Sequence, residues 1–191
     1  MRASALPARH PRRLSVKVIA QYQTIPRARA PASSHQHQPS SAAISVSTGE
    51  RAIAERVYAL VNEQREAAGK KSMRGHYGLN LLAQKHSLYM GSTLSDANHF
   101  GSENRAQYAY LKYGIENLSE MTYVVYGGSN DPASDAVEAW KASPSHMKHM
   151  LQSWDLTGVG VEKVATGDIY ITICMGAQPL GVPRGIRPIG W

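Results

Sequence analysis

The stretch AVEAWKASPSH, residues 136–146, decides the fold of this 191-residue chain. Val137 and Trp140 lie three residues apart, so they face the same side of a helix. Pro144 cannot continue that helix, but it suits the first turn of a new one, which Ser143 can cap. The stretch therefore predicts two short helices joined at a break, with Trp140 toward the core and His146 at the start of the second helix.

Upstream of this stretch the apolar spacing predicts three more helices, near residues 49–68, 78–94 and 102–113. Ser47 and Glu50 have the spacing of a capping box at the start of the first helix. Ser102 is expected to cap the third helix, and Asp131 to cap the helix that contains Trp140. The chain between these two helices is rich in β-branched and aromatic residues from 116 to 126, which favours an extended strand.

Downstream, residues 159–164 and 168–174 predict a β-hairpin, because two strand-like runs flank a short turn. In the second run, Ile169, Ile171 and Ile173 alternate with other residues, which predicts one buried face. Helices followed by a terminal hairpin indicate the α+β class.

The charge of the chain is concentrated at one end. Residues 1–49 contain seven of the 21 basic residues and none of the 14 acidic ones. Residues 50–191 therefore contain 14 basic and 14 acidic residues, whose charges cancel. A balanced body argues against a nucleic-acid footprint. No apolar run approaches the roughly 18 residues of a membrane span.

The composition divides the chain into a Pro-, Ser- and Arg-rich tail at 1–48, a domain at 49–178 and a Pro- and Gly-rich tail at 179–191. The first tail is too polar to offset its ordering entropy, which predicts disorder. Its interpretations are a transit peptide, a basic arm that binds anionic lipid or nucleic acid, a misplaced translation start, or a plain solvated tail. A secretory signal is disfavoured because Lys17 interrupts the short apolar run at 14–20.

Two residues that could carry chemistry have simpler structural interpretations. Cys174 is the only cysteine, which excludes an intrachain disulfide, and its strand-like surroundings favour a buried, inert thiol. His86 falls on the apolar stripe of the helix at 78–94, where a packed, hydrogen-bonded histidine is favoured over a ligand.

His99, Glu116 and His146 are the residue types that bind a metal or move protons. They lie in a loop, a strand start and a helix start, and their spacing alone does not bring them together. The HExxH motif and the serine-centred elbow motif are both absent from the sequence.

The order of several short stretches resembles the CAP superfamily, named for cysteine-rich secretory proteins, antigen 5 and pathogenesis-related 1. The resemblance is to its prokaryotic, disulfide-free SCP-like branch, and it covers residues 53–177. The matching stretches are 82–90, His99, 114–118, 136–140, 143–146, 158–161 and 169–172.

This resemblance implies an α-β-α sandwich with a small antiparallel sheet between helices, and a central cleft with a cluster of two histidines and two acids. His99 and His146 match the histidines, and Glu116 matches the first acid. Ser143 occupies the position of the second acid, so the acidic half of the cluster is incomplete. The implied ligand-binding cleft contains His99, Glu116, His146 and Ser143, and the implied metal ligands are His99, His146 and Glu116. We expect at most a weak Zn²⁺ site there.

Three functions are compatible with the resemblance. The first is a non-enzymatic module that binds a lipid-like, small amphipathic or peptide ligand in the cleft. The second is a weak metal-dependent hydrolase. The third is an interaction module that the basic tail anchors to an anionic surface. The resemblance also implies a secreted or cell-envelope location.

Overall fold

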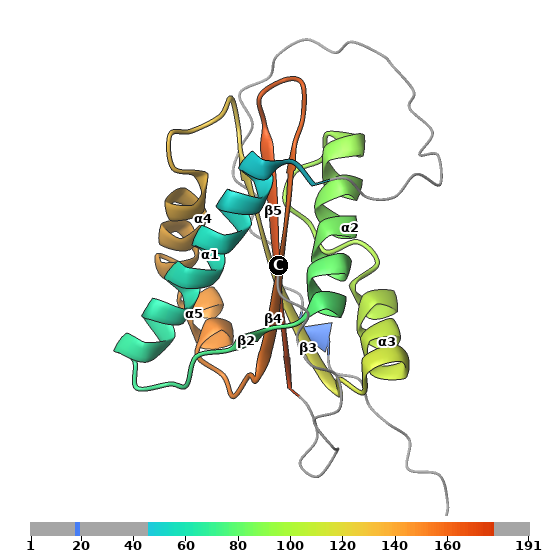
Figure 1. Cartoon of the computed structure of the whole chain (residues 1–191), viewed down its shortest axis with the longest axis vertical. Coiled ribbons are helices and arrows are strands. Elements are labelled where there is room, and N and C mark those ends of the chain that lie inside the picture. The colour runs from blue at the N-terminus through green and yellow to red at the C-terminus, as the bar shows by residue number, and fades with distance from the viewer. Residues whose placement is uncertain (1–17, 20–45, 178–191) are drawn as a thin grey trace, which may run out of the picture.

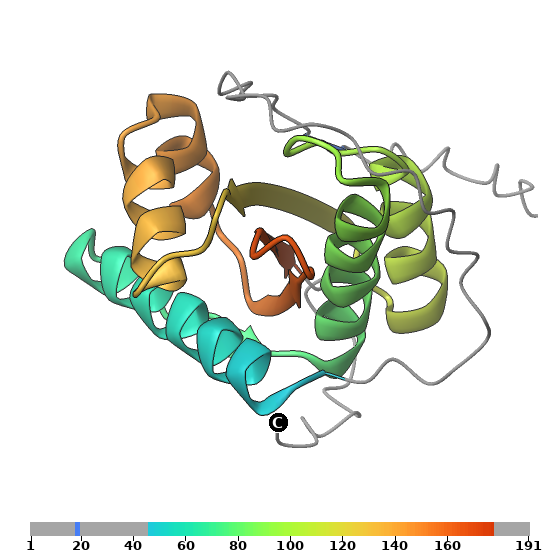
Figure 2. The same cartoon turned by 90° about the horizontal axis from the view of Figure 1, so that it is seen from above.

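Three layers make up the protein, in a computed structural model that describes residues 18–19 and 46–177. One layer contains α1 (Thr48–Ala67), α4 (Pro132–Lys141) and α5 (Pro144–Met150), and the other contains α2 (Tyr77–Thr93) and α3 (Ser102–Tyr113). The sheet lies between them, as the front view and the view from above agree (Figures 1 and 2). The predicted α-β-α sandwich of the α+β class is confirmed.

The sheet has the strand order β1-β3-β5-β4-β2. Its long strands β3 (Asn117–Val125), β5 (Ile169–Ala177) and β4 (Leu156–Lys163) pair antiparallel, as expected. The two-residue strands β1 (Val18–Ile19) and β2 (Arg74–Gly75) pair in parallel with β3 and β4, so the sheet is mixed. Such short additions cover backbone groups that an edge strand would otherwise expose. β1 comes from the N-terminal tail; the rest of the tail up to residue 45, and residues 178–191, lie outside the described residues.

Both faces of β5 are buried, so the prediction of one buried face was wrong. Ile169, Ile171 and Ile173 face the layer of α1 and α4, as their place in the larger core cluster shows. Tyr170, Thr172 and Cys174 are at most 1 % exposed on the other face. Helix α2 covers this second face of β5, the central strand of the sheet. Ser87 of α2 donates a hydrogen bond to the Thr172 hydroxyl there at 2.9 Å.

The predicted N-terminal caps of α1 and α4 are confirmed, and the predicted cap of α3 is wrong. Ser47 and Glu50 form the capping box of α1, and Asp131 accepts a hydrogen bond from the Ser134 amide at the start of α4. Ser102 is the first residue of α3 and not its cap, because Gly101 holds the cap position with a left-handed φ of 74°. Glycine adopts this conformation with little strain.

Helix α2 packs directly on the backbone of β4. Gly158 and Gly160 face it, and a β-carbon at either position would overlap the backbone of α2. Gln84 of α2 donates to the Val161 carbonyl at 2.7 Å and accepts from the Val161 amide at 3.0 Å. The glycines therefore permit a close approach, and the helix in turn satisfies polar groups of the strand.

Trp140 is 1 % exposed where α4 meets the sheet, and its indole N–H donates to the Thr122 carbonyl at 3.2 Å. This confirms the core orientation that the opening stretch predicts. Among the helices that the structure describes, none has the length and apolar character needed to cross a membrane.

Candidate functional site

A buried carboxylate, Glu120, is the centre of the polar cluster that the fold assembles. It lies on β3, on the same face as Leu118, which packs against residues of α2 and α3. His99, in the loop before α3, places its Nδ1 2.9 Å from Glu120 Oε1. Arg105 of α3 donates from Nε to Oε2 at 2.7 Å and from Nη2 to Oε1 at 2.8 Å.

His86 of α2 also lies near the same carboxylate. Its Nε2 lies 2.7 Å from the Asn98 carbonyl and 3.6 Å from Glu120 Oε1. Within the described part of the chain its Nδ1 is buried without a hydrogen-bond partner. Burial is the main cause that lowers the pKa of His86, although the Glu120 charge opposes it. His86 is thus a packed, hydrogen-bonded histidine, as its position on α2 predicts.

The charges around Glu120 determine its protonation. Burial alone would raise the pKa of this carboxyl, but hydrogen bonds from His99 and Arg105 and the Arg105 charge lower it to about 2. Cys174 lies on the same side, with Sγ 3.9 Å from Oε2. Burial first, and the Glu120 charge second, raise the pKa of the Cys174 thiol well above its usual range. The thiol is therefore buried, as predicted, and its raised pKa disfavours the thiolate.

His146 belongs to the opposite helical layer, in α5, and is 5 % exposed. Burial is the first cause that lowers the pKa of its imidazole, and the charge of His99 is the second. His99 therefore affects the charge state of His146, although His146 belongs to the layer of α1, α4 and α5. His146 Nδ1 and the Ser119 hydroxyl of β3 are both buried without a hydrogen-bond partner among the described residues.

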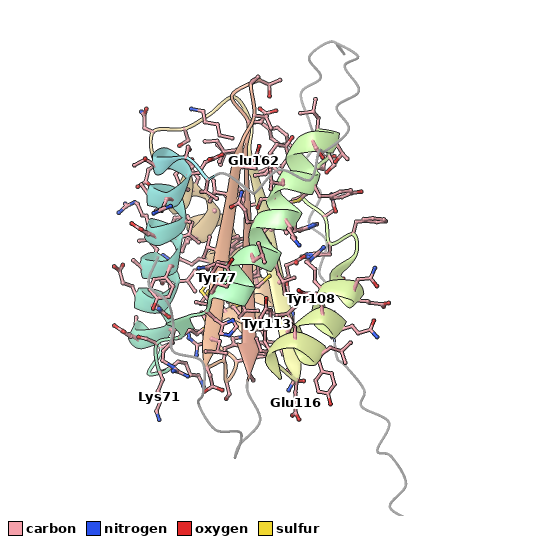
Figure 3. All side chains as sticks on the ribbon, turned by 45° about the vertical axis from the view of Figure 1, so that its right-hand side comes forward. Lys71, Tyr77, Tyr108, Tyr113, Glu116 and Glu162 are labelled. Carbon is pink, nitrogen blue, oxygen red and sulfur yellow. The ribbon has the colours of Figure 1, made fainter. Side chains whose placement is uncertain are left out.

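The other two predicted site residues lie elsewhere or are already bonded. Glu116 is exposed just before β3 (Figure 3), where its backbone amide donates to the Ala177 carbonyl at 3.2 Å. Ser143 is buried, and its hydroxyl lies 2.9 Å from that of Ser145.

Sequence reasoning missed Glu120 and Arg105. One signal was present: an acid inside a strand-like run, where burial requires a partner.

The Zn²⁺ expectation can be compared with the donors that the fold brings together. Across residues 18–19 and 46–177, no group of three histidine, cysteine or acidic side chains could hold a metal ion. Both oxygens of Glu120 already accept charged or imidazole hydrogen bonds. The described residues therefore do not fit a three-ligand Zn²⁺ site, and the weak site remains a prediction.

A cavity of about 510 Å³ lies where the first residue of β3 pairs with the last residue of β5. None of the predicted site residues lines it. Its lining residues are Lys70, Asn117, Leu151, Gln152, Ser153, Trp154 and Ala177.

Comparison with known proteins agrees with this architecture. A family model described as CAP, the cysteine-rich secretory protein family, matches residues 58–175. None of the curated proteins matches the chain.

Among solved structures, an outer surface protein from Borrelia burgdorferi is 18 % identical with a TM-score of 0.53, and the match covers 69 % of this chain and 95 % of that one. An extracellular protein containing an SCP domain, from Bacillus anthracis, is 17 % identical with a TM-score of 0.56 over 71 % of this chain and 45 % of that one. At this identity the likeness shows the fold alone.

Proposed function

Because the chain belongs to the CAP, or cysteine-rich secretory protein, family, we propose that it is a non-enzymatic module that binds a small amphipathic or peptide ligand. The observation that carries this proposal is the state of Glu120, the acid that the fold brings to His99. Its carboxylate is bound by a guanidinium through two hydrogen bonds, at 2.7 and 2.8 Å. A binding module needs a site of defined shape and polarity, and it needs no reactive base.

Hydrolysis would require a general base whose pKa is near the working pH. The pKa of Glu120 is lowered to about 2, so this carboxylate is a weak base at neutral pH. The pKa of Cys174 is raised by burial, so this residue offers no thiolate nucleophile. These two groups therefore supply neither the base nor the nucleophile of a hydrolase.

Polar atoms on the α5 side of β3 support a ligand with a polar head. His146 Nδ1 and Ser119 Oγ are buried, and neither has a partner in the part of the chain described. Buried polar groups are normally hydrogen-bonded, so each of these two atoms could accept a hydrogen bond from a polar group of a ligand or donate one to it.

The location of the structural relatives supports a matching proposal for this chain. They are an outer surface protein and an extracellular protein. We propose that this chain also acts outside the cytoplasm or in the cell envelope. The seven basic residues of the N-terminal segment would then suit an anionic surface.

Turnover and binding assays on the same protein test the proposal. We expect saturable binding of a fluorescent fatty-acid analogue or an amphipathic peptide, and no turnover of casein or p-nitrophenyl esters above a His146→Ala control, with or without Zn²⁺. Glu116→Gln is a matched variant of Glu120→Gln, because it removes an exposed acid from the same part of the chain. Metal-dependent turnover that is lost in folded His146→Ala and Glu120→Gln, and kept in Glu116→Gln, would establish the hydrolase instead.

A further inference from the structure

We propose that Arg105 is a built-in cation that keeps Glu120 from acting as a metal ligand. The cluster of His99, Arg105 and Glu120 then forms without a metal ion. This inference concerns the same site as the proposed function and rests on it. Arg105 acts through Glu120, so it is a positioning residue.

The first step is the saturation of the carboxylate. Arg105 approaches edge-on, with Nε at 2.7 Å from one oxygen and Nη2 at 2.8 Å from the other. This two-point geometry is the strong form of an arginine–carboxylate pair. His99 Nδ1 adds a third contact, at 2.9 Å from Oε1. A metal ion that used Glu120 as a ligand would have to displace at least one of these contacts.

The second step is the anchoring of Arg105 on its other side. Its Nη1 donates to the Phe100 carbonyl at 2.8 Å, so the guanidinium is held by the loop before α3 as well as by the acid. The left-handed Gly101 sets the start of α3 from which Arg105 returns over this loop. Arg105 is therefore held by one contact that does not involve Glu120. Displacing its guanidinium would break hydrogen bonds both to Glu120 and to the Phe100 carbonyl.

The third step is the charge of the buried site. The side chain of Glu120 is 4 % exposed and that of Arg105 is 13 % exposed. One negative and one positive charge cancel there, and water has little access to screen an added charge. A divalent cation beside the guanidinium would meet repulsion in a medium of low dielectric constant. The pair therefore disfavours metal at the carboxylate, whereas the two imidazoles alone offer only two ligands.

Zinc titration calorimetry on the full chain tests this inference. We expect weak Zn²⁺ binding by the wild-type protein, unchanged by Glu120→Gln, since the carboxylate is not available as a ligand. Arg105→Met should raise Zn²⁺ affinity about tenfold or more, a typical scale for changes beside metal ligands. In the double variant Arg105→Met/Glu120→Gln the gain should disappear. Circular dichroism establishes that each variant is folded.

The inference is overturned if Glu120→Gln weakens Zn²⁺ binding by the wild-type protein, or if folded Arg105→Met binds no better than wild type. If Arg105→Met does not fold, the comparison of wild type with Glu120→Gln still decides. A second readout is the imidazole nitrogen resonances of His99: Arg105→Met should shift them, whereas Lys112→Met, on the same helix but exposed, should leave them in place. Ligand binding without turnover could still hold if these metal results failed, so the two proposals fail separately.

Discussion

Glu120 carries its charge where only 4 % of its side chain is exposed. Arg105 compensates that charge, and His99 lies within hydrogen-bond distance of the same carboxylate. Glu120→Gln should therefore lower the free energy of unfolding by about 3–5 kcal/mol, because it leaves Arg105 without its counter-ion in a mostly buried place. Urea denaturation followed by circular dichroism measures this. Glu116→Gln is the control, and we expect a change within about 0.5 kcal/mol because that side chain is exposed. Equal stabilities of the two variants would contradict the pairing of Glu120.

Trp140 offers a second test at this scale. Its side chain is buried and its indole donates to Thr122 O, so Trp140→Ala should cost about 3–5 kcal/mol of unfolding free energy. Acrylamide should barely quench the fluorescence of Trp140 in a variant that keeps it as the sole tryptophan. Ready quenching there would mean that α4 presents another face to the sheet.

The candidate site could be predicted from the sequence at some residues and not at others. The family resemblance implied His99 and His146, and both side chains are buried in the structure. Glu116 matched the same pattern, yet the structure leaves it exposed and buries Glu120, four residues further along. The reason is non-local. Glu120 is buried because Arg105 of α3 and His99 of the preceding loop bind its carboxylate, and no short sequence motif predicts these contacts.

At the scale of elements, the contact between α2 and β4 depends on the absence of side chains. A β-carbon on Gly160 would overlap the backbone at Gln84. Gly160→Ala should push the helix away, weaken the paired bonds between Gln84 and Val161, and cost about 1–3 kcal/mol or more. Gly49→Ala is the matched control, since nothing lies within 4 Å of its added carbon, and we expect it to be neutral or stabilising by up to about 1 kcal/mol. Thermal unfolding measures both, and an unchanged melting temperature for Gly160→Ala would refute the close packing.

Helix positions followed from the sequence because their signals are local. The capping box at Ser47 and the Asp131–Pro132 start act within a few residues, and the structure places α1 and α4 accordingly. The burial of both faces of β5 did not follow, because it depends on α2 crossing a strand about ninety residues away in the chain. Gly101 as the cap of α3 was also missed, since a left-handed glycine cap contributes no side-chain signal.

For the molecule as a whole, the two outermost strands of the sheet, β1 and β2, are very short. β1 and β2 are two residues each, yet they turn an antiparallel sheet of three long strands into a mixed sheet. Strands this short have no periodicity to read, so the layer architecture was predictable and the edge pairing was not. Within the described residues, β1 pairs with Leu118 and Ser119 of β3, so this short pairing ends directly before Glu120.

The whole fold should also lose stability in acid, in two stages. The pKa values of His86, His146 and His149 are lowered in the folded protein, first of all by burial. A histidine with a lowered folded pKa contributes stability that is complete above its unfolded value of about 6.5 and is lost as the pH falls below it. Glu120 follows at lower pH: its pKa of about 2 lies below the usual 4.5, so its contribution, on the order of 3 kcal/mol, is lost between about pH 5 and pH 2. Urea denaturation at a series of acidic to neutral pH values should show the highest free energy of unfolding near pH 7, a decline below 6.5 and a further decline below 4.5. In Glu120→Gln the second decline should be smaller. A stability that is the same at pH 7 and pH 3, or a second decline that is unchanged in that variant, would contradict the ionised, buried state of Glu120 on which the proposed site depends.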